Sequence, residues 1–208
     1  MRIKIGLTLL VVLISAGNLL ADSPITSTDI YKAYESSPIV IEAKKAKGIL
    51  NKKLMNYLID EKNPIDKKIA LISAISWDIN GRNNSKKFFE FLKKKRGYKN
   101  KKDFLKRGKP YELLSMAYLR AMDDYFKVDE ALIYANKALE KKPDSYTYNI
   151  IQALIKAQKE MDNNWCNVFL ATDNVRKNKT LKKDLNKKAT EIIFKYMDLY
   201  KDSCEEKK

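Results

Sequence analysis

The chain has 208 residues, of which 42 are lysine or arginine and 26 are aspartate or glutamate, so its formal net charge at pH 7 is +16. It contains no histidine, which nearly excludes zinc sites and histidine-based catalytic triads. Apolar residues make up 45 %, and only six glycines and five prolines are present. This balance favours one helical domain, or a small array of helical hairpins, over a turn-rich β fold.

The first elements in chain order form a segment typical of secretory signal peptides. Residues 1–21 begin with Arg2 and Lys4, continue with an apolar stretch and end in small residues. The apolar stretch is interrupted at Gly17 and is shorter than the ~20 residues that a membrane-spanning helix needs. We expect cleavage after Ala21, or alternatively after Gly17, and a periplasmic or secreted mature chain without an integral membrane span. An uncleaved membrane anchor is the alternative.

The remaining elements have helical periodicity, without strand-like alternation of useful length. The connections between them are short, as antiparallel helical hairpins require. The expected helices occupy residues 26–37, 39–62, 63–81, two short stretches within 86–109, then 109–125, 129–142, 144–164, 165–178 and 181–203.

Residues 86–109, which we call the basic segment, hold twelve lysines or arginines against Glu90 and Asp103. An anionic envelope polymer or lipid is therefore one candidate ligand, with Lys93, Lys94, Lys95 and Arg96 as contacts. The alternative is an ordinary solvated face, because 36 of the 42 basic residues are lysine, which suggests compositional bias. Nucleic acid is not expected as a partner, since base and phosphate recognition prefers arginine.

Two cysteines, Cys166 and Cys204, stand at the start of one expected helix and the end of another. If these helices form an antiparallel hairpin in an oxidising compartment, the two thiols meet and form a disulfide. Such a bridge across 38 residues stabilises the fold by about 3–4 kcal/mol in the chain-entropy description. Two buried free thiols are the alternative.

The stretch "DEALIYANKALEKKPDS" at residues 129–145 places Ala131 and Ala138 two helical turns apart and ends its helix at Pro143. It resembles the second helix of a tetratricopeptide repeat (TPR). The resemblance is weaker over residues 111–178. It implies an α-solenoid of antiparallel helical hairpins closed by a polar capping helix at 181–203. We accordingly divide the mature chain into N-terminal hairpins at 22–108 and TPR-like repeats at 109–208.

The resemblance also implies a function. In this family the first helices of the repeats form a groove that binds a peptide or a partner protein, here another envelope or secreted protein. The alternative for each groove residue is an ordinary solvated position. The residues that the resemblance places in the groove are Leu113, Met116, Arg120, Asp123, Asn149, Gln152 and Lys156.

Catalysis is not expected. The acidic pairs Asp123/Asp124 and Asp129/Glu130 are adjacent in sequence, so on a helix they point in different directions and cannot flank one substrate. The sequence carries no phosphate-binding glycine loop, serine nucleophile elbow or HExxH motif. We therefore predict neither an enzyme, nor a cofactor, nor a metal site.

Overall fold

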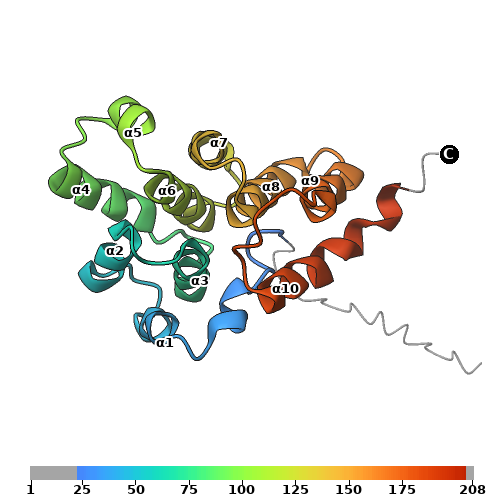
Figure 1. Ribbon diagram of the computed structural model, residues 1–208, viewed down its shortest axis with the longest axis horizontal. Coiled ribbons are helices and arrows are strands. Elements are labelled where there is room, and N and C mark those ends of the chain that lie inside the picture. Colours follow the sequence, from blue (N-terminus) through green and yellow to red (C-terminus); the bar gives the residue numbers. More distant parts are fainter. Residues whose placement is uncertain (1–22, 205–208) are drawn as a thin grey trace, which may run out of the picture.

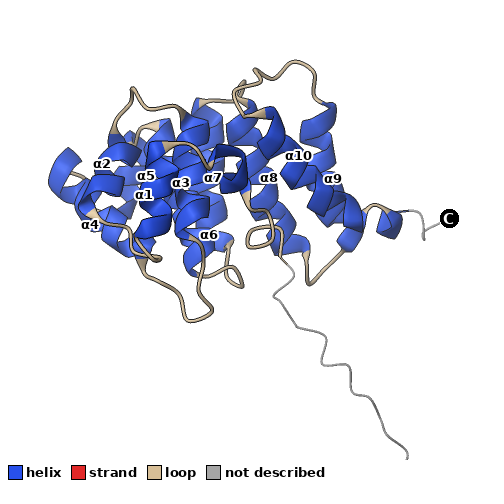
Figure 2. Cartoon of the chain, turned by 90° about the horizontal axis from the view of Figure 1, so that it is seen from below, coloured by secondary structure: helices blue, strands red, loops and turns tan. Residues whose placement is uncertain are grey.

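The computed structural model describes residues 23–204, and within them it has the all-α fold that the sequence predicts (Figures 1 and 2). The predicted signal peptide and both of its cleavage positions lie outside the described residues. None of the described helices combines the length and apolarity that crossing a bilayer requires. The elements are η1 Ile30–Tyr34, α1 Pro38–Lys45, α2 Lys52–Ile59, α3 Ile65–Ile75, α4 Asn84–Arg96, α5 Lys101–Arg107, α6 Pro110–Asp123, α7 Asp129–Lys141, α8 Tyr146–Glu160, α9 Trp165–Lys177, α10 Lys187–Met197, η2 Asp198–Tyr200 and η3 Asp202–Cys204, where η denotes a 3₁₀ helix.

The single long helix predicted at residues 39–62 is wrong, because the chain breaks it into α1 and α2. The break contains Lys47 and Gly48, whose φ angles of 46° and 86° are incompatible with a right-handed helix. The side chain of Asn51 then caps α2 by accepting a hydrogen bond from the Leu54 amide at 3.0 Å. Ile49, which directly follows this break, is consequently 56 % exposed.

The middle of the chain forms successive helical hairpins. Helix α6 packs against α7, α7 against α8, and α8 against α9 (Figure 1). Ala131, Ala135 and Ala138 are all buried on α7. Their small side chains allow the neighbouring helices to approach closely, which is the packing that the alanine spacing predicts.

The predicted C-terminal helix begins six residues later than expected. Residues 181–186 instead run as an extended strap beside the start of α8, where Ser145 and Lys182 form an isolated β-bridge. The Asp184 carboxylate accepts hydrogen bonds from the Ser145 hydroxyl and, at 2.8 Å, from the Thr147 amide. These bonds satisfy backbone amides at the start of α8 that have no partner within that helix. Residues 181–186 are therefore held extended instead of forming the first turns of α10.

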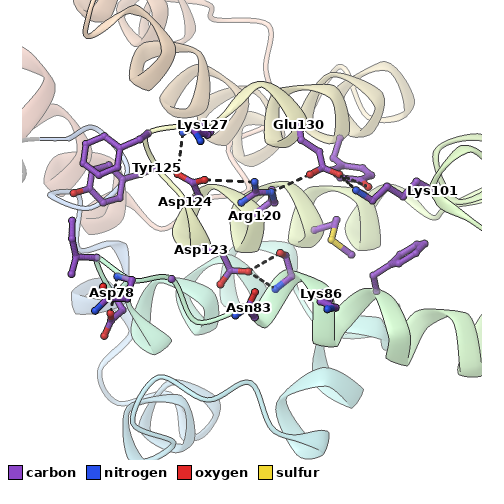
Figure 3. Close-up of a pocket in the computed structure, with 18 of the residues that line it drawn as sticks. Asp78, Asn83, Lys86, Lys101, Arg120, Asp123, Asp124, Tyr125, Lys127 and Glu130 are labelled. Carbon is purple, nitrogen blue, oxygen red and sulfur yellow. Dashed lines mark hydrogen bonds and ion pairs between the residues drawn. The ribbon is translucent and has the colours of Figure 1, made fainter.

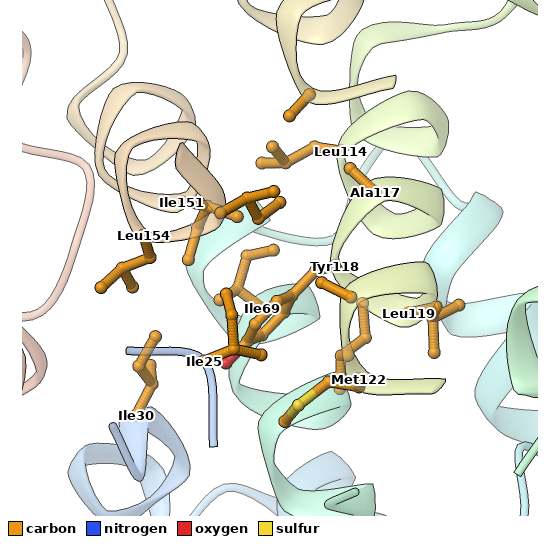
Figure 4. Close-up of a cluster of buried hydrophobic side chains, with 14 of the residues drawn as sticks. Ile25, Ile30, Ile69, Leu114, Ala117, Tyr118, Leu119, Met122, Ile151 and Leu154 are labelled. Atoms are coloured by element: carbon orange, nitrogen blue, oxygen red, sulfur yellow. The ribbon is translucent and has the colours of Figure 1, made fainter. Parts of the chain in front are cut away.

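The hydrophobic core is continuous from the N-terminal segment to the last described helices. Figure 4 shows Ile25 and Ile30 beside Ile69 of α3, Tyr118 of α6 and Leu154 of α8. Buried residues stand on both sides of the predicted boundary at 108/109, so the core itself does not mark two domains. The division stays a prediction.

Two contacts join the beginning of the described chain to segments in its C-terminal half. The Tyr34 hydroxyl donates to Asp66 Oδ2 at 2.9 Å and accepts from the Asn186 amide at 3.0 Å. Ser23 also hydrogen-bonds Gln158. Helix α10 therefore packs against η1 as well as against α9.

The predicted disulfide is formed between Cys166 and Cys204, with an S–S distance of 2.09 Å. It joins the first turn of α9 to η3, the arrangement expected from an antiparallel pairing of the two final segments.

Candidate functional site

A cavity of about 820 Å³ opens between α4, α6 and α7 (Figure 3). The loop at residues 76–83, between α3 and α4, and the loop at 124–128, between α6 and α7, form its rim. We call this space the α4–α6–α7 cavity. Its volume falls in the usual range for sites that bind small molecules or peptide side chains.

One wall of the cavity is held in place by Asp123, at the end of α6. Its carboxylate accepts hydrogen bonds from the amides of Asn84 and Ser85, at 3.0 and 2.7 Å, and from the Ser85 hydroxyl at 2.6 Å. These amides are the first of α4 and have no partner within that helix. Asp123 thus caps α4 from a distant helix and fixes the angle between the two walls.

The opposite wall contains an ionic cluster centred on Glu130 of α7. Arg120 Nε lies 3.1 Å from Glu130 Oε2, and Lys101 forms an ion pair with the other carboxylate oxygen. Burial alone would raise the pKa of the Glu130 carboxyl, but the hydrogen bonds from Lys101 and Arg120 outweigh it and hold the pKa below its ordinary value. Arg120 also lies 3.8 Å from Asp124. The cluster joins α5, α6 and α7 into one rigid surface.

The rim carries two large apolar side chains that face solvent, Ile79 at 62 % exposure and Phe126 at 69 %. The Phe126 ring lies 4.2 Å from that of the buried Tyr125, which contacts Trp77 edge to face at 5.3 Å. The Tyr125 hydroxyl has no hydrogen-bond partner among the described residues. Exposed apolar side chains beside a cavity are typical of binding sites.

Two lysines of the cavity, Lys86 on α4 and Lys127 in the rim loop, form no ion pair with any residue in the range 23–204. Both are exposed at the surface of the protein. They differ in this from Lys101 and Arg120, whose charges are already engaged with Glu130.

The structure brings together three of the seven predicted groove residues, since Met116, Arg120 and Asp123 all line the α4–α6–α7 cavity. Leu113 is fully buried in the core and offers no surface to a partner, so its assignment to the groove is corrected. The fold places the other three on α8, outside the cavity: Asn149, Gln152 and Lys156.

The α8 residues are partly engaged within the protein. The Asn149 side chain donates to the carbonyls of Pro143 and Ser145, at 2.9 and 2.8 Å, and Gln152 donates to Asn136 at 2.9 Å. Lys156 is exposed. Their assignment to a partner surface stays a prediction.

Of the four residues predicted to bind an anion, two are bound within the protein. Arg96 Nε lies 2.8 Å from the fully buried Glu112, and a second nitrogen of Arg96 donates to the Ile59 carbonyl at 2.8 Å. Lys93 lies 3.3 Å from Glu90. Lys94 and Lys95 are exposed and have no ion pair among the described residues. Arg96 is thus engaged within the fold while still exposed, and its assignment as an anion contact stays a prediction.

A second, more open hollow of about 600 Å³ lies over α5 and the residues before it. Lys99, Lys102 and Lys106 line it and form no ion pair with residues 23–204, whereas Arg107 is engaged with Asp103 at 2.6 Å. We call it the α5 hollow.

Sequence reasoning missed the rim of the cavity, namely Ile79, Tyr125 and Phe126. The consecutive aromatics at 125–126 directly follow a helix, which is a usable signal, but the sequence alone assigns such residues to the core. The described residues contain no group of three or more cysteines, aspartates or glutamates arranged to hold a metal ion. No protein family, curated protein or solved structure matches the chain.

Proposed function

We propose that the protein is an exported helical-repeat adaptor that binds a segment of a partner protein in the α4–α6–α7 cavity. The observation that carries this proposal is the cavity of about 820 Å³ with two solvent-facing apolar side chains, Ile79 and Phe126, at its rim. An apolar side chain of a partner gains most of its binding free energy by leaving water in such a pocket.

The state of the cavity's carboxylates supports binding rather than catalysis. Asp123 is held by amides of α4, and Glu130 by Lys101 and Arg120. A carboxylate that acts as a general acid or base needs access to the substrate and a pKa near the working pH. The lowered pKa of Glu130 is the opposite of what a general acid requires.

Two further features support the repeat and export parts of the proposal. The consecutive hairpins α6/α7 and α8/α9, with buried alanines along α7, are compatible with a TPR-like solenoid. The disulfide is compatible with an oxidising compartment, as is the signal-like segment at residues 1–21.

Site-specific photo-crosslinking tests the cavity. A benzophenone amino acid is placed at Phe126 in one variant and at Leu199, which is 71 % exposed and remote in sequence, in a control variant. We expect a defined adduct only from position 126. The captured protein is then purified, and its affinity is measured for Phe126→Ser and Leu199→Ser. Loss of affinity confined to Phe126→Ser supports the proposal, and equal affinities for both variants contradict it.

A second candidate function is retention of an anionic lipid or polymer by the basic segment. The observation that favours it is the α5 hollow, where Lys99, Lys102 and Lys106 have no ion pair in the described part of the chain. Its test is flotation of the protein with phosphatidylglycerol vesicles at low and high salt. Replacing these three lysines with glutamate should abolish low-salt binding, and unchanged flotation would exclude this function.

A further inference from the structure

The cavity and the basic segment share a wall, because Lys86, Phe89, Glu90 and Lys101 belong to both. The two surfaces that the sequence presents as alternative sites are therefore neighbours in the fold. A partner that enters the cavity lies beside the strongest concentration of positive charge in the chain.

The acidic side chains of the cavity are already engaged inside the protein. Each of the five accepts at least one hydrogen bond from a cation or from a backbone amide: Asp78 from the Asn80 amide, Glu90 from Lys93, Asp123 from the amides of α4, Asp124 from the Lys127 amide, and Glu130 from Arg120 and Lys101. The lining residues hold four cationic side chains and five carboxylates, and Arg82 and Lys93 outside the lining each pair with one of those carboxylates.

The two cationic groups left over are suited to an acidic ligand. Lys86 and Lys127 have no ion pair within the described residues. The Tyr125 hydroxyl, buried in the wall, has no partner there either. Because this oxygen is buried, it is not accessible to a ligand in the cavity.

We propose that the segment bound in the cavity is an acidic stretch of a partner protein that carries an aromatic or aliphatic side chain. Its carboxylates contact Lys86 and Lys127, and its apolar side chain packs on Phe126 and Ile79. The inference rests on the function proposed above and adds the chemistry of the partner. Complementary charge provides the orientation, while the apolar contact provides binding that persists at high salt.

Fluorescence anisotropy with the full-length chain tests this chemistry. The probe is a fluorescein-labelled peptide in which aspartate and glutamate surround a central phenylalanine. One control peptide has lysine in place of every acidic residue, and another has alanine in place of the phenylalanine. We expect the acidic peptide to bind more tightly than either control.

A pair of protein variants with equal charge change locates the site. Lys86→Glu with Lys127→Glu should lower the affinity for the acidic peptide by about tenfold or more, and a tenfold loss corresponds to about 1.4 kcal/mol of binding free energy. Lys183→Glu with Lys188→Glu changes two other exposed lysines without an ion pair among the described residues, and should leave the affinity unchanged. Equal weakening in both double variants, or equal binding of the lysine peptide, would overturn the inference.

The crosslink from position 126 separates this inference from the proposed function. An adduct with a partner whose bound segment carries no acidic residues would overturn the acidic-ligand inference and leave the cavity as a binding site. Absence of a position-specific adduct, together with equal affinities of the three peptides, would overturn both.

Discussion

At the scale of single residues, Lys68 is the most unusual side chain of the described structure. It is fully buried, donates to the Asp60 carbonyl at 2.6 Å and lies 3.9 Å from the centre of the Tyr111 ring. Burial lowers the pKa of Lys68 to about 8, although the nearby Asp60 and Glu112 oppose the shift. The protein therefore holds a cation where water cannot solvate it fully.

This burial predicts a pH dependence of stability. Because the pKa of Lys68 is lower in the folded protein than in the unfolded chain, the unfolded chain binds the proton more tightly between about pH 8 and 10.5. The Lys68 contribution to the free energy of unfolding should thus rise with pH across this window, by up to about 1.4 kcal/mol per pH unit. Tyrosine ionisation in the unfolded chain opposes the rise above about pH 10.

Urea unfolding of wild type and Lys68→Met at pH 7, 8, 9 and 10 measures this contribution. The difference between the two free energies of unfolding should change by more than 1 kcal/mol, in favour of the wild type, as pH rises from about 8 to 10. Lys67→Met, on the exposed side of the same helix, provides the control. A constant difference for Lys68→Met would show that Lys68 is not held in an unfavourable charged state.

The sequence is least informative about which charged side chains pair with one another in the fold. Arg96 belongs to a run of basic residues, and nothing local distinguishes it from Lys94 or Lys95. Its partner Glu112 lies sixteen residues later and on another helix, so only the fold brings them together. By contrast the alanines of α7 could be assigned correctly, because helical spacing alone places them on one face.

At the scale of elements, the loop at residues 76–83 positions the rim of the cavity. Three of its residues, Ser76, Gly81 and Asn83, have positive φ angles. A Cβ atom at Gly81 would lie 2.7 Å from the Asp123 carbonyl oxygen. Both the backbone conformation and the close approach to α6 therefore favour glycine at this position.

Gly81→Ala should lower the free energy of unfolding by about 1–3 kcal/mol, since it combines left-handed strain with a contact too short to keep. Gly97→Ala is the matched control: its φ of 68° is nearly the 72° of Gly81, but apart from its chain neighbours no described residue lies within 4 Å of the added Cβ. The loss measured by urea unfolding should be larger for Gly81→Ala. Equal losses would mean that the contact with Asp123 is easily relieved.

Helix α7 permits a test of the small-residue packing. Ala138 is completely buried, so Ala138→Leu forces extra volume into a close helix contact and should cost about 1–3 kcal/mol. Glu140→Leu, at an exposed position of the same helix, should change the melting temperature little. An unchanged melting temperature for Ala138→Leu would contradict the close packing of α7.

Some boundaries of the helices follow from local sequence signals, and others depend on tertiary contacts. Pro38 and Pro110 are the first residues of α1 and α6, where a proline costs no hydrogen bond. The strap at 181–186 could not be predicted, since its bonds go to Ser145 and Thr147 in a distant part of the chain. Helical periodicity continues through a segment that tertiary contacts hold extended.

At the scale of the whole molecule, the disulfide should be a large single contribution to stability. Reduction of the bridge between Cys166 and Cys204 should lower the free energy of unfolding by about 3–4 kcal/mol. The measurement is urea unfolding with and without dithiothreitol, and Cys166→Ser with Cys204→Ser should reproduce the reduced protein. A reductant effect that persists in the double variant would show that the change does not come from the bridge.

The contact between Tyr34 and Asn186 joins positions 152 residues apart in the sequence. A contact of this span can form only after the intervening helices have collapsed into place, because closing so long a loop early carries a large entropic cost. Tandem helical hairpins can fold unit by unit, each on its neighbour, and such arrays can lose one terminal unit at a time. Here the segment around Tyr34 and the segment around Asn186 are hydrogen-bonded to each other. We therefore expect these two terminal segments to unfold together in one cooperative step.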